Sequence, residues 1–287
     1  MTATAAATSE YLTAPNRVVS AANGIDYAYR AVGDGTPALV LLQHFRGNLD
    51  NWDPALVDRL AQDREVILLA NRGVGASTGV VPDNVSDMAR DVLRFVDALP
   101  LRDIDLLGFS LGGYIGQELA LVRPRLIRRL VLAGTAPQGA PKIHRWTDDV
   151  YALATQDVAD PDRFIRLFFS GSQESRAKGM EYLKRISSRT ADRDEPIDLA
   201  TRDAQLGAIA RWGIPDPSKL TRLGAITQPT LVANGDNDTM MITENSYLLA
   251  HHIPTAQLRI YPDAGHGFLN QYPELFADHV NAFLNGG

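Results

Sequence analysis

The sequence of 287 residues contains no cysteine. This absence excludes disulfide bonds, thiolate zinc sites and a cysteine nucleophile, and it is compatible with a reducing compartment. No stretch approaches the ~20 apolar residues that a membrane-spanning helix needs. The formal net charge is −6, and the basic residues form no concentrated stripe. We therefore expect neither nucleic acid nor a membrane as a partner.

The amino-terminal residues also lack the pattern of a signal peptide. Residues 1–9 are small and polar, with no positive region and no leucine-type apolar run, so they do not resemble a signal peptide. We expect a disordered tail over residues 1–15 and a cytoplasmic protein. The whole sequence is 45% hydrophobic and 22% charged, which is ordinary for a globular protein. Its length suits one large domain with room for an inserted subdomain.

Short apolar runs alternate with helical patterns along most of the chain. Apolar runs that predict buried strands occur at 38–42, 66–70, 104–107, 127–133, 229–233 and 257–261. Helical patterns occur at 52–61, 86–99, 111–121, 242–251 and 273–284. Two alternating runs around Asn23 and Gly24 add a hairpin over 17–32. This order predicts an α/β fold with a mostly parallel central sheet and helices on both faces.

The alternation is interrupted after the sixth predicted strand. Residues 137–212 contain no buried-strand run, and amphipathic, charged helices are predicted at 146–154, 161–169, 176–188 and 199–211. We interpret 137–212 as a helical lid inserted into a core formed by 16–136 and 213–287. Its large apolar side chains are expected to pack inward or to face a pocket: Trp146, Phe164, Phe168, Phe169, Met180 and Trp212.

A serine lies at the sharpest predicted turn of the chain. The segment Gly108-Phe109-Ser110-Leu111-Gly112 has the spacing G-x-S-x-G between a strand and a helix. Such a turn exposes the serine hydroxyl, and the glycines remove side chains that would collide with neighbouring backbone. The start of the following helix offers unpaired N–H groups to a developing negative charge. The alternative is that Ser110 only caps that helix.

Two further loops follow strands whose carboxyl ends share one edge of the predicted sheet. Asp236 and Asp238 follow the run at 229–233, and His266 follows the run at 257–261. Ligands of doubly wound sheets bind at this edge. The chain order serine, aspartate, histidine is the one expected for a triad built on this arrangement. His266 could then accept the proton of Ser110, with a carboxylate stabilising the imidazolium that forms.

From about Asn16 onward the chain resembles the α/β-hydrolase fold superfamily. The matching segments are His44-Phe45-Arg46-Gly47, Gly108-Phe109-Ser110-Leu111-Gly112, Gly235-Asp236-Asn237-Asp238 and Gly265-His266-Gly267. Within the superfamily it is most similar to the esterases and cofactor-free haloperoxidases (perhydrolases). That resemblance implies that Asp238 is the acid of the triad and that Asp236 orders the turn. It also implies an oxyanion hole formed by the N–H groups of Phe45 and Leu111.

The resemblance implies a hydrolase of carboxylic esters or lactones that forms an acyl-enzyme at Ser110, with peroxide as a second acyl acceptor and no metal or organic cofactor. The small-molecule substrate would lie against the lid, with Arg46, Trp146, Phe168 and Phe169 as candidate pocket residues. Arg46 is either a contact for an anionic substrate or a solvated loop residue. His144, His251, His252 and His279 have no carboxylate spacing for a metal. The alternatives are a carbon–carbon bond hydrolase, a hydroxynitrile lyase, or a ligand receptor that has kept the triad.

Overall fold

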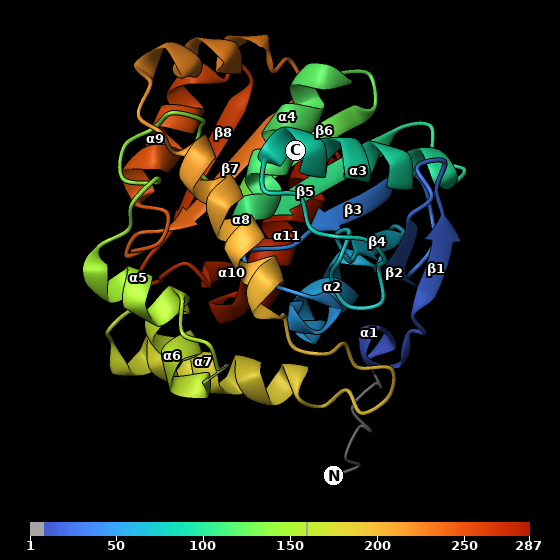
Figure 1. Cartoon of the computed structure of the whole chain (residues 1–287), viewed down its shortest axis with the longest axis horizontal. Coiled ribbons are helices and arrows are strands. Elements are labelled where there is room, and N and C mark those ends of the chain that lie inside the picture. Colours follow the sequence, from blue (N-terminus) through green and yellow to red (C-terminus); the bar gives the residue numbers. More distant parts are fainter. Residues whose placement is uncertain (1–8, 159) are drawn as a thin grey trace.

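The computed structural model describes residues 9–158 and 160–287, and an eight-stranded sheet runs through its centre (Figure 1). The strands are β1 (Arg17–Ser20), β2 (Asp26–Val32), β3 (Ala38–Leu42), β4 (Val66–Leu69), β5 (Ile104–Phe109), β6 (Ile127–Ala133), β7 (Thr230–Gly235) and β8 (Ala256–Tyr261). The α-helices of the core are α1 (Glu10–Thr13), α2 (Pro54–Leu60), α3 (Val85–Ala98), α4 (Leu111–Val122), α9 (Thr243–His252), α10 (Phe268–Gln271) and α11 (Pro273–Leu284). Two 3₁₀ helices, η1 (Leu49–Asn51) and η2 (Pro217–Ala225), complete the core.

The strand order is β1-β2-β4-β3-β5-β6-β7-β8. The pairs β1/β2 and β2/β4 are antiparallel, and all other neighbours are parallel. Leu42 of β3 is the register partner of Gly108 in β5, and Gly108 is the partner of Leu132 in β6. The carboxyl ends of these strands therefore lie level at one edge of the sheet. The predicted hairpin and the mostly parallel sheet are confirmed.

Burial along the strands reflects their place in the sheet. Every residue of β3, β4, β5 and β7 is buried, whereas the edge strand β8 alternates between exposed and partly buried residues. Helices α2 and α11 pack against each other, and α3 packs against α4, which also contacts β5 and β6 (Figure 1). The continuous apolar runs in the sequence thus have helices on both sides, because strands covered on both faces expose no polar side.

Helices fill the segment between β6 and β7 that was predicted as an insertion: α5 (Asp148–Ala154), α6 (Pro161–Phe168), α7 (Gln173–Ile186) and α8 (Leu199–Trp212). In Figure 1, α5, α6 and α7 lie together beside the sheet, and α8 crosses in front of it. The expectation that Met180 packs inward is wrong, because its side chain is 59% exposed on the outer face of α7. Within the described ranges, no helix combines the length and apolarity needed to cross a bilayer.

The disordered tail predicted over residues 1–15 is wrong for its second half. Residues 10–13 form α1, and the Ser9 side chain accepts the N–H of Leu12 as its cap. Tyr11 is buried, and its hydroxyl donates to the carbonyl of Leu49. An aromatic residue with a buried acceptor elsewhere in the fold is held in place, and the local composition does not contain that information. Residues 1–8 lie outside the described part of the chain.

Candidate active site

Ser110 occupies the turn between β5 and α4 in a strained conformation. Its backbone has φ +55° and ψ −116°, a region that non-glycine residues rarely adopt. The N–H of Ser110 donates to the carbonyl of Ala133 (2.8 Å), and its carbonyl accepts the hydroxyl of Thr135 (2.8 Å). Bonds from the neighbouring strand β6 and the residues after it therefore hold the turn in place.

The two glycines of the turn are required by close backbone contacts. A Cβ atom at Gly108 would lie 2.3 Å from the carbonyl oxygen of Gly112, and one at Gly112 would lie 2.2 Å from that of Leu42. Both separations are far inside van der Waals contact, so any side chain would push β3, β5 and α4 apart. The G-x-S-x-G spacing thus follows from tight packing of α4 against the strand ends.

The hydroxyl of Ser110 does not serve as a helix cap. Ser110 stands at the N-cap position of α4 but makes no side-chain capping bond. Its Oγ is buried and has no hydrogen-bond partner in the described structure. The alternative interpretation of Ser110 as a cap is therefore excluded, and a buried hydroxyl without a partner is a costly feature that needs another explanation.

His266 and Asp238 form a buried pair. His266 Nδ1 lies 2.7 Å from Asp238 Oδ2, and since a carboxylate only accepts, Nδ1 carries the proton and Nε2 of the neutral ring is left free to accept. Asp238 Oδ1 accepts the N–H groups of Met240 and Met241 at 2.8 Å each, which fixes the carboxylate. Asp236 is exposed, and its Oδ1 accepts the N–H of Ala264 (3.1 Å), so it orders the turn.

The end of β6 brings Ser110 and His266 to the same place. Ser110 is bonded to Ala133, and a Cβ on the next residue, Gly134, would lie 3.4 Å from Nδ1 and Cε1 of the His266 ring. His266 Nε2, like Ser110 Oγ, is buried without a partner among the described residues. Proton-transfer pairs are often poorly aligned until a substrate binds. The arrangement can therefore pass a proton from a serine hydroxyl to an imidazole that a carboxylate holds in one tautomer.

The loop after β3 and the start of α4 each supply one backbone N–H group. No acceptor in residues 9–158 and 160–287 takes the N–H of Phe45 or that of Leu111. Arg46 has φ +62°, and its N–H donates to Oε1 of the buried Gln205 (2.7 Å), which pins the loop to α8. Leu111 stands at the first position of α4, where N–H groups have no intrahelical acceptor.

His44 is a site residue to which the sequence analysis gave no role. Its Nδ1 donates to the carbonyl of Phe45 (2.8 Å), so its Nε2 is an acceptor, and Nε2 is buried without a partner in the described structure. Burial lowers the pKa of His44 to about 3, so the imidazole stays neutral. The His44 ring lies 5.2 Å from that of Phe109, which in turn lies 5.0 Å from His266.

A cavity of about 410 Å³ opens beside His44 and Phe45, between the loop after β3, helices α5–α7 and the connector from α7 to α8. Apolar side chains line one part of it: Phe45, Phe164, Leu167, Phe168, Leu183, Ile186, Pro196, Ile197 and Met240. Polar groups line the rest: His44, Arg46, Asn48, Asp50, Asn51, Asp157, Asp160, Arg163, Arg193 and Asp194. The volume lies in the range of small-molecule sites.

Two of the four candidate pocket residues line this cavity and two do not. Arg46 and Phe168 belong to its wall. The prediction is wrong for Trp146, which packs behind Phe45 (5.8 Å between ring centroids) and donates its indole N–H to the carbonyl of Met240. It is also wrong for Phe169, which lies against Tyr182 of α7 (6.3 Å). Phe168 is the last residue of α6, whereas the backbone at Phe169 is extended, and the two neighbouring side chains have different surroundings.

Phe168 joins the cavity to the histidine loop. Its ring lies 5.0 Å from the ring of His44 and 5.3 Å from that of His266, and it stacks on Phe164 at 4.0 Å. Its carbonyl accepts the N–H of Gly267 (2.6 Å). The carboxyl end of α6 is therefore docked directly on the loop that carries His266.

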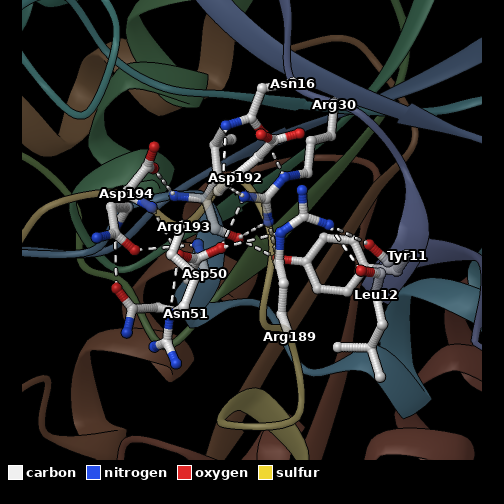
Figure 2. Close-up of polar contacts among 12 residues, drawn as sticks. Tyr11, Leu12, Asn16, Arg30, Asp50, Asn51, Arg189, Asp192, Arg193 and Asp194 are labelled. Atoms are coloured by element: carbon white, nitrogen blue, oxygen red, sulfur yellow. Dashed lines mark hydrogen bonds and ion pairs between the residues drawn. The ribbon is translucent and has the colours of Figure 1, made fainter.

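A charged cluster forms another wall of the cavity, centred on Asp50 (Figure 2). Asp50 pairs with Arg30 at 2.7 Å, and Arg189 and Arg193 lie 3.7 and 3.8 Å from it. Asp50 Oδ2 also accepts the N–H of Asp194 (2.8 Å). We call Asp50, Arg30, Arg189, Arg193 and Asp194 the Asp50 cluster. The Asp50 cluster connects three parts of the fold: η1, β2 and the connector between α7 and α8.

No group of three or more metal-ligating side chains occurs in the described ranges. The site is therefore described by its serine, imidazoles, carboxylate and backbone N–H groups.

Comparison with known proteins gives one family. A family model described as alpha/beta hydrolase fold matches residues 37–270. Among solved structures, an alpha/beta hydrolase fold protein from Chitinophaga pinensis superposes with a TM-score of 0.91 at 43% sequence identity, over 97% of this chain and 100% of that chain.

Two curated relatives are similar over most of their length. A protein of Agrobacterium fabrum with the name "Putative carbamate hydrolase RutD" is 28% identical over 86% of this chain and 93% of its own. A pimeloyl-[acyl-carrier protein] methyl ester esterase of Nitrosomonas europaea is 28% identical over 87% of this chain and 96% of its own.

Proposed function

This chain belongs to the α/β-hydrolase fold family, and on that premise we propose that it hydrolyses carboxylic esters or lactones through an acyl-enzyme at Ser110. The observation that carries the proposal is the unpartnered, buried Oγ of Ser110 on a strained turn, beside an imidazole that is fixed by Asp238 at 2.7 Å. The names of the relatives, an ester hydrolase and a carbamate hydrolase, support carbonyl substrates of this kind.

In the proposed reaction Ser110 Oγ attacks the substrate carbonyl while its proton passes to His266 Nε2. Asp238 keeps the proton of His266 on Nδ1 and stabilises the imidazolium that forms. The tetrahedral oxyanion is bound by the N–H groups of Phe45 and Leu111, which have no other acceptor among the described residues. His266 then protonates the leaving alcohol, and the acyl group remains on Ser110.

Deacylation repeats these steps with water. His266 accepts a proton from water while the water oxygen attacks the acyl carbonyl. The carboxylic acid then leaves, and Ser110 Oγ takes the proton back from His266. Hydrogen peroxide in place of water would give a peracid, which is the perhydrolase side activity that we propose. A carbamate would pass through the same two steps, with a carbamoyl group on Ser110.

Active-site labelling tests the proposal. A fluorophosphonate probe should label the wild type, and the Ser110→Ala variant should lose both the label and several orders of magnitude of ester kcat. Ser246→Ala is the matched control, because Ser246 is also buried with an unpartnered Oγ but lies on α9. Labelling that persists in Ser110→Ala would place the nucleophile elsewhere.

Turnover of a p-nitrophenyl ester series separates the alternatives. An enzyme turns over repeatedly, whereas a receptor that has kept the triad would release about one equivalent of nitrophenol and stop. Activity toward carbon–carbon or cyanohydrin substrates without ester turnover would favour the carbon–carbon hydrolase or the hydroxynitrile lyase.

A further inference from the structure

Two arginines on the cavity wall converge on one backbone carbonyl. Nη1 of Arg46 donates to the carbonyl of Gln156 (2.6 Å) and to that of Ala154 (3.2 Å) at the end of α5. Nη1 of Arg163, on α6, donates to the same carbonyl of Gln156 (3.3 Å). Both side chains are partly buried. Two like charges are therefore held near each other in a partly desolvated place.

The carboxylates around the cavity form no ion pair with these two arginines. Within the described ranges, no carboxylate oxygen lies within 4.0 Å of the guanidinium of Arg46 or Arg163. Each of the four carboxylates on the wall has its own partner instead: Asp50 with Arg30 (2.7 Å), Asp157 with Arg202 (2.7 Å), Asp160 with the N–H of Asp162 (3.1 Å), and Asp194 with the N–H of Leu49 (2.9 Å). Neither Arg46 nor Arg163 therefore has a direct ion-pair partner among the described residues.

The hydrogen-bond donors of these arginines are only partly used. A guanidinium has five N–H groups, and every bond described for these two side chains involves Nη1. Nε of Arg163 is buried and has no partner in the described structure. The Nε–Nη2 edge of each side chain is one of the edges that binds a planar carboxylate with two parallel hydrogen bonds.

The pKa values of both arginines are also lowered by burial. Burial, together with the positive charges of Arg163 and Arg202, lowers the pKa of Arg46 to about 10, although Asp157 and Asp203 act in the opposite direction. Burial likewise lowers the pKa of Arg163. An anion bound between the two side chains would replace lost hydration and relieve their repulsion.

We propose that Arg46 and Arg163 bind a carboxylate of the substrate, so that the protein acts on esters or lactones that carry a carboxylate away from the scissile carbonyl. This inference rests on the proposed function for its catalytic part. Phe45 and Phe168 line the cavity beside the catalytic residues and would contact the apolar part that separates the two groups. Arg46 and Arg163 are specificity residues in this proposal, and the competing explanation is that Arg46 only caps the carboxyl end of α5.

Matched substrates test the preference. The ratio of kcat/KM for mono-p-nitrophenyl glutarate to that for p-nitrophenyl pentanoate places the carboxylate in the acyl half, and 4-acetoxybenzoate against phenyl acetate places it in the alcohol half. In at least one pair the charged ester should be preferred, and Arg163→Gln should reduce that ratio about ten- to a hundredfold, the range of one or two charge-assisted hydrogen bonds. Arg163→Lys should restore part of it.

The control is Arg166→Gln, the same change on the same helix at an exposed residue, which should leave the ratio unchanged. The cap of α6 uses the backbone N–H of Arg163 (3.4 Å from Asp160 Oδ2), so Arg163→Gln keeps that bond. Neutral esters preferred in both pairs, or equal ratios in Arg163→Gln and Arg166→Gln, would overturn the carboxylate site.

Equilibrium binding separates this inference from the proposed function. Calorimetric titration of the Ser110→Ala variant with monomethyl adipate should show binding that weakens with rising salt and that is lost in Ser110→Ala/Arg163→Gln. Inorganic phosphate bound in place of the adipate ester, or no difference between the two variants, would refute the site. If binding behaves as expected but the wild type fails to take up the fluorophosphonate probe, only the proposed function fails.

Discussion

Backbone strain marks the residues of the site that the chain holds most firmly. Ser110 and Arg46 have φ of +55° and +62°, and each such position costs of order 1–3 kcal/mol. Hydrogen bonds from other parts of the fold stabilise both, through Ala133 at Ser110 and through Gln205 at Arg46. These hydrogen bonds hold the strained backbone in place, and they thereby orient the serine side chain and the peptide of Phe45 before a substrate binds.

The two aspartates of the turn after β7 should differ in mutagenesis. Asp238→Asn removes the acceptor that selects the tautomer of His266, and losses in kcat for that role can reach about 10⁴-fold. Asp236→Asn keeps an oxygen for the N–H of Ala264 and should cost far less. The test is the kcat of the two folded variants in steady-state kinetics. A larger loss of kcat in Asp236→Asn would show that the acid partner of His266 is assigned wrongly.

His44 should make the stability of the protein depend on pH. Its pKa falls from 6.5 to about 3 on folding, so below pH 6.5 the unfolded chain binds a proton that the native protein does not. The stabilisation is complete above that pH and is lost as the pH falls. Between about pH 8 and about pH 5 this term amounts to about 2 kcal/mol.

Urea unfolding at both pH values measures this term. His44→Asn, which keeps a donor for the carbonyl of Phe45, should lose about 2 kcal/mol less than the wild type over that interval. His144→Asn removes an exposed imidazole and should follow the wild type. Parallel pH curves for all three proteins would contradict a neutral, buried His44.

At the scale of elements, α6 is the part of the segment between β6 and β7 that reaches the proposed catalytic residues. Phe168 touches both imidazoles and lines the cavity, and its carbonyl binds Gly267. The sheet brings Ser110, Asp238 and His266 to one edge, and residues of α5, α6 and α7 line the cavity beside the loop after β3. We therefore propose that 137–212 acts as a lid that shapes the acyl pocket and excludes water.

Shortening Phe168 should change which acyl chains fit. Phe168→Ala enlarges the cavity next to His266, so the preferred p-nitrophenyl ester should become longer, with about 1–3 kcal/mol of discrimination per methylene. Phe169→Ala and Trp146→Ala are controls, because both side chains are buried outside the cavity. Chain-length profiles that are identical in all three variants would limit Phe168 to holding the lid together.

At the scale of the whole molecule, the Asp50 cluster joins segments that are distant in the sequence. Arg189 of the α7–α8 connector donates to the carbonyls of Tyr11 (3.2 Å) and Leu12 (2.9 Å), and Arg30 of β2 lies beside both Tyr11 and Asp50 (Figure 2). Arg30 is fully buried and Arg189 nearly so. Asp50 thus forms ion pairs with arginines from the amino-terminal part of the core and from the segment between β6 and β7.

Removing that carboxylate should destabilise the protein strongly. Asp50→Asn leaves Arg30 and Arg189 buried without a negative partner, and breaking a buried pair in this way costs about 3–5 kcal/mol. Asp278→Asn breaks the exposed pair with Arg59 and should leave the urea midpoint almost unchanged. Equal midpoints for the two variants would mean that the Asp50 cluster contributes no more than a surface pair.

The edge of the sheet that carries Ser110, Asp238 and His266 could be predicted from the sequence, because much of what forms it is local. The G-x-S-x-G spacing reflects a contact between residues four apart, Gly108 and Gly112, besides the contact of Gly112 with Leu42 of β3. Parallel strands read from apolar runs place the residues after them at one edge, which brought Asp238 and His266 together. The helices of the insertion were equally visible, since their periodicity lies within each segment.

Only the tertiary structure decided which side chains face the cavity and which charges meet. Phe168 and Phe169 are indistinguishable as sequence neighbours, and the docking of α6 on the histidine loop selects one of them. Arg46 meets the carbonyl of Gln156 from 110 residues away, and Arg189 meets Tyr11 from 178 residues away. Contacts of that range depend on how the insertion packs on the sheet, a property of the whole fold that no local pattern of residue types specifies.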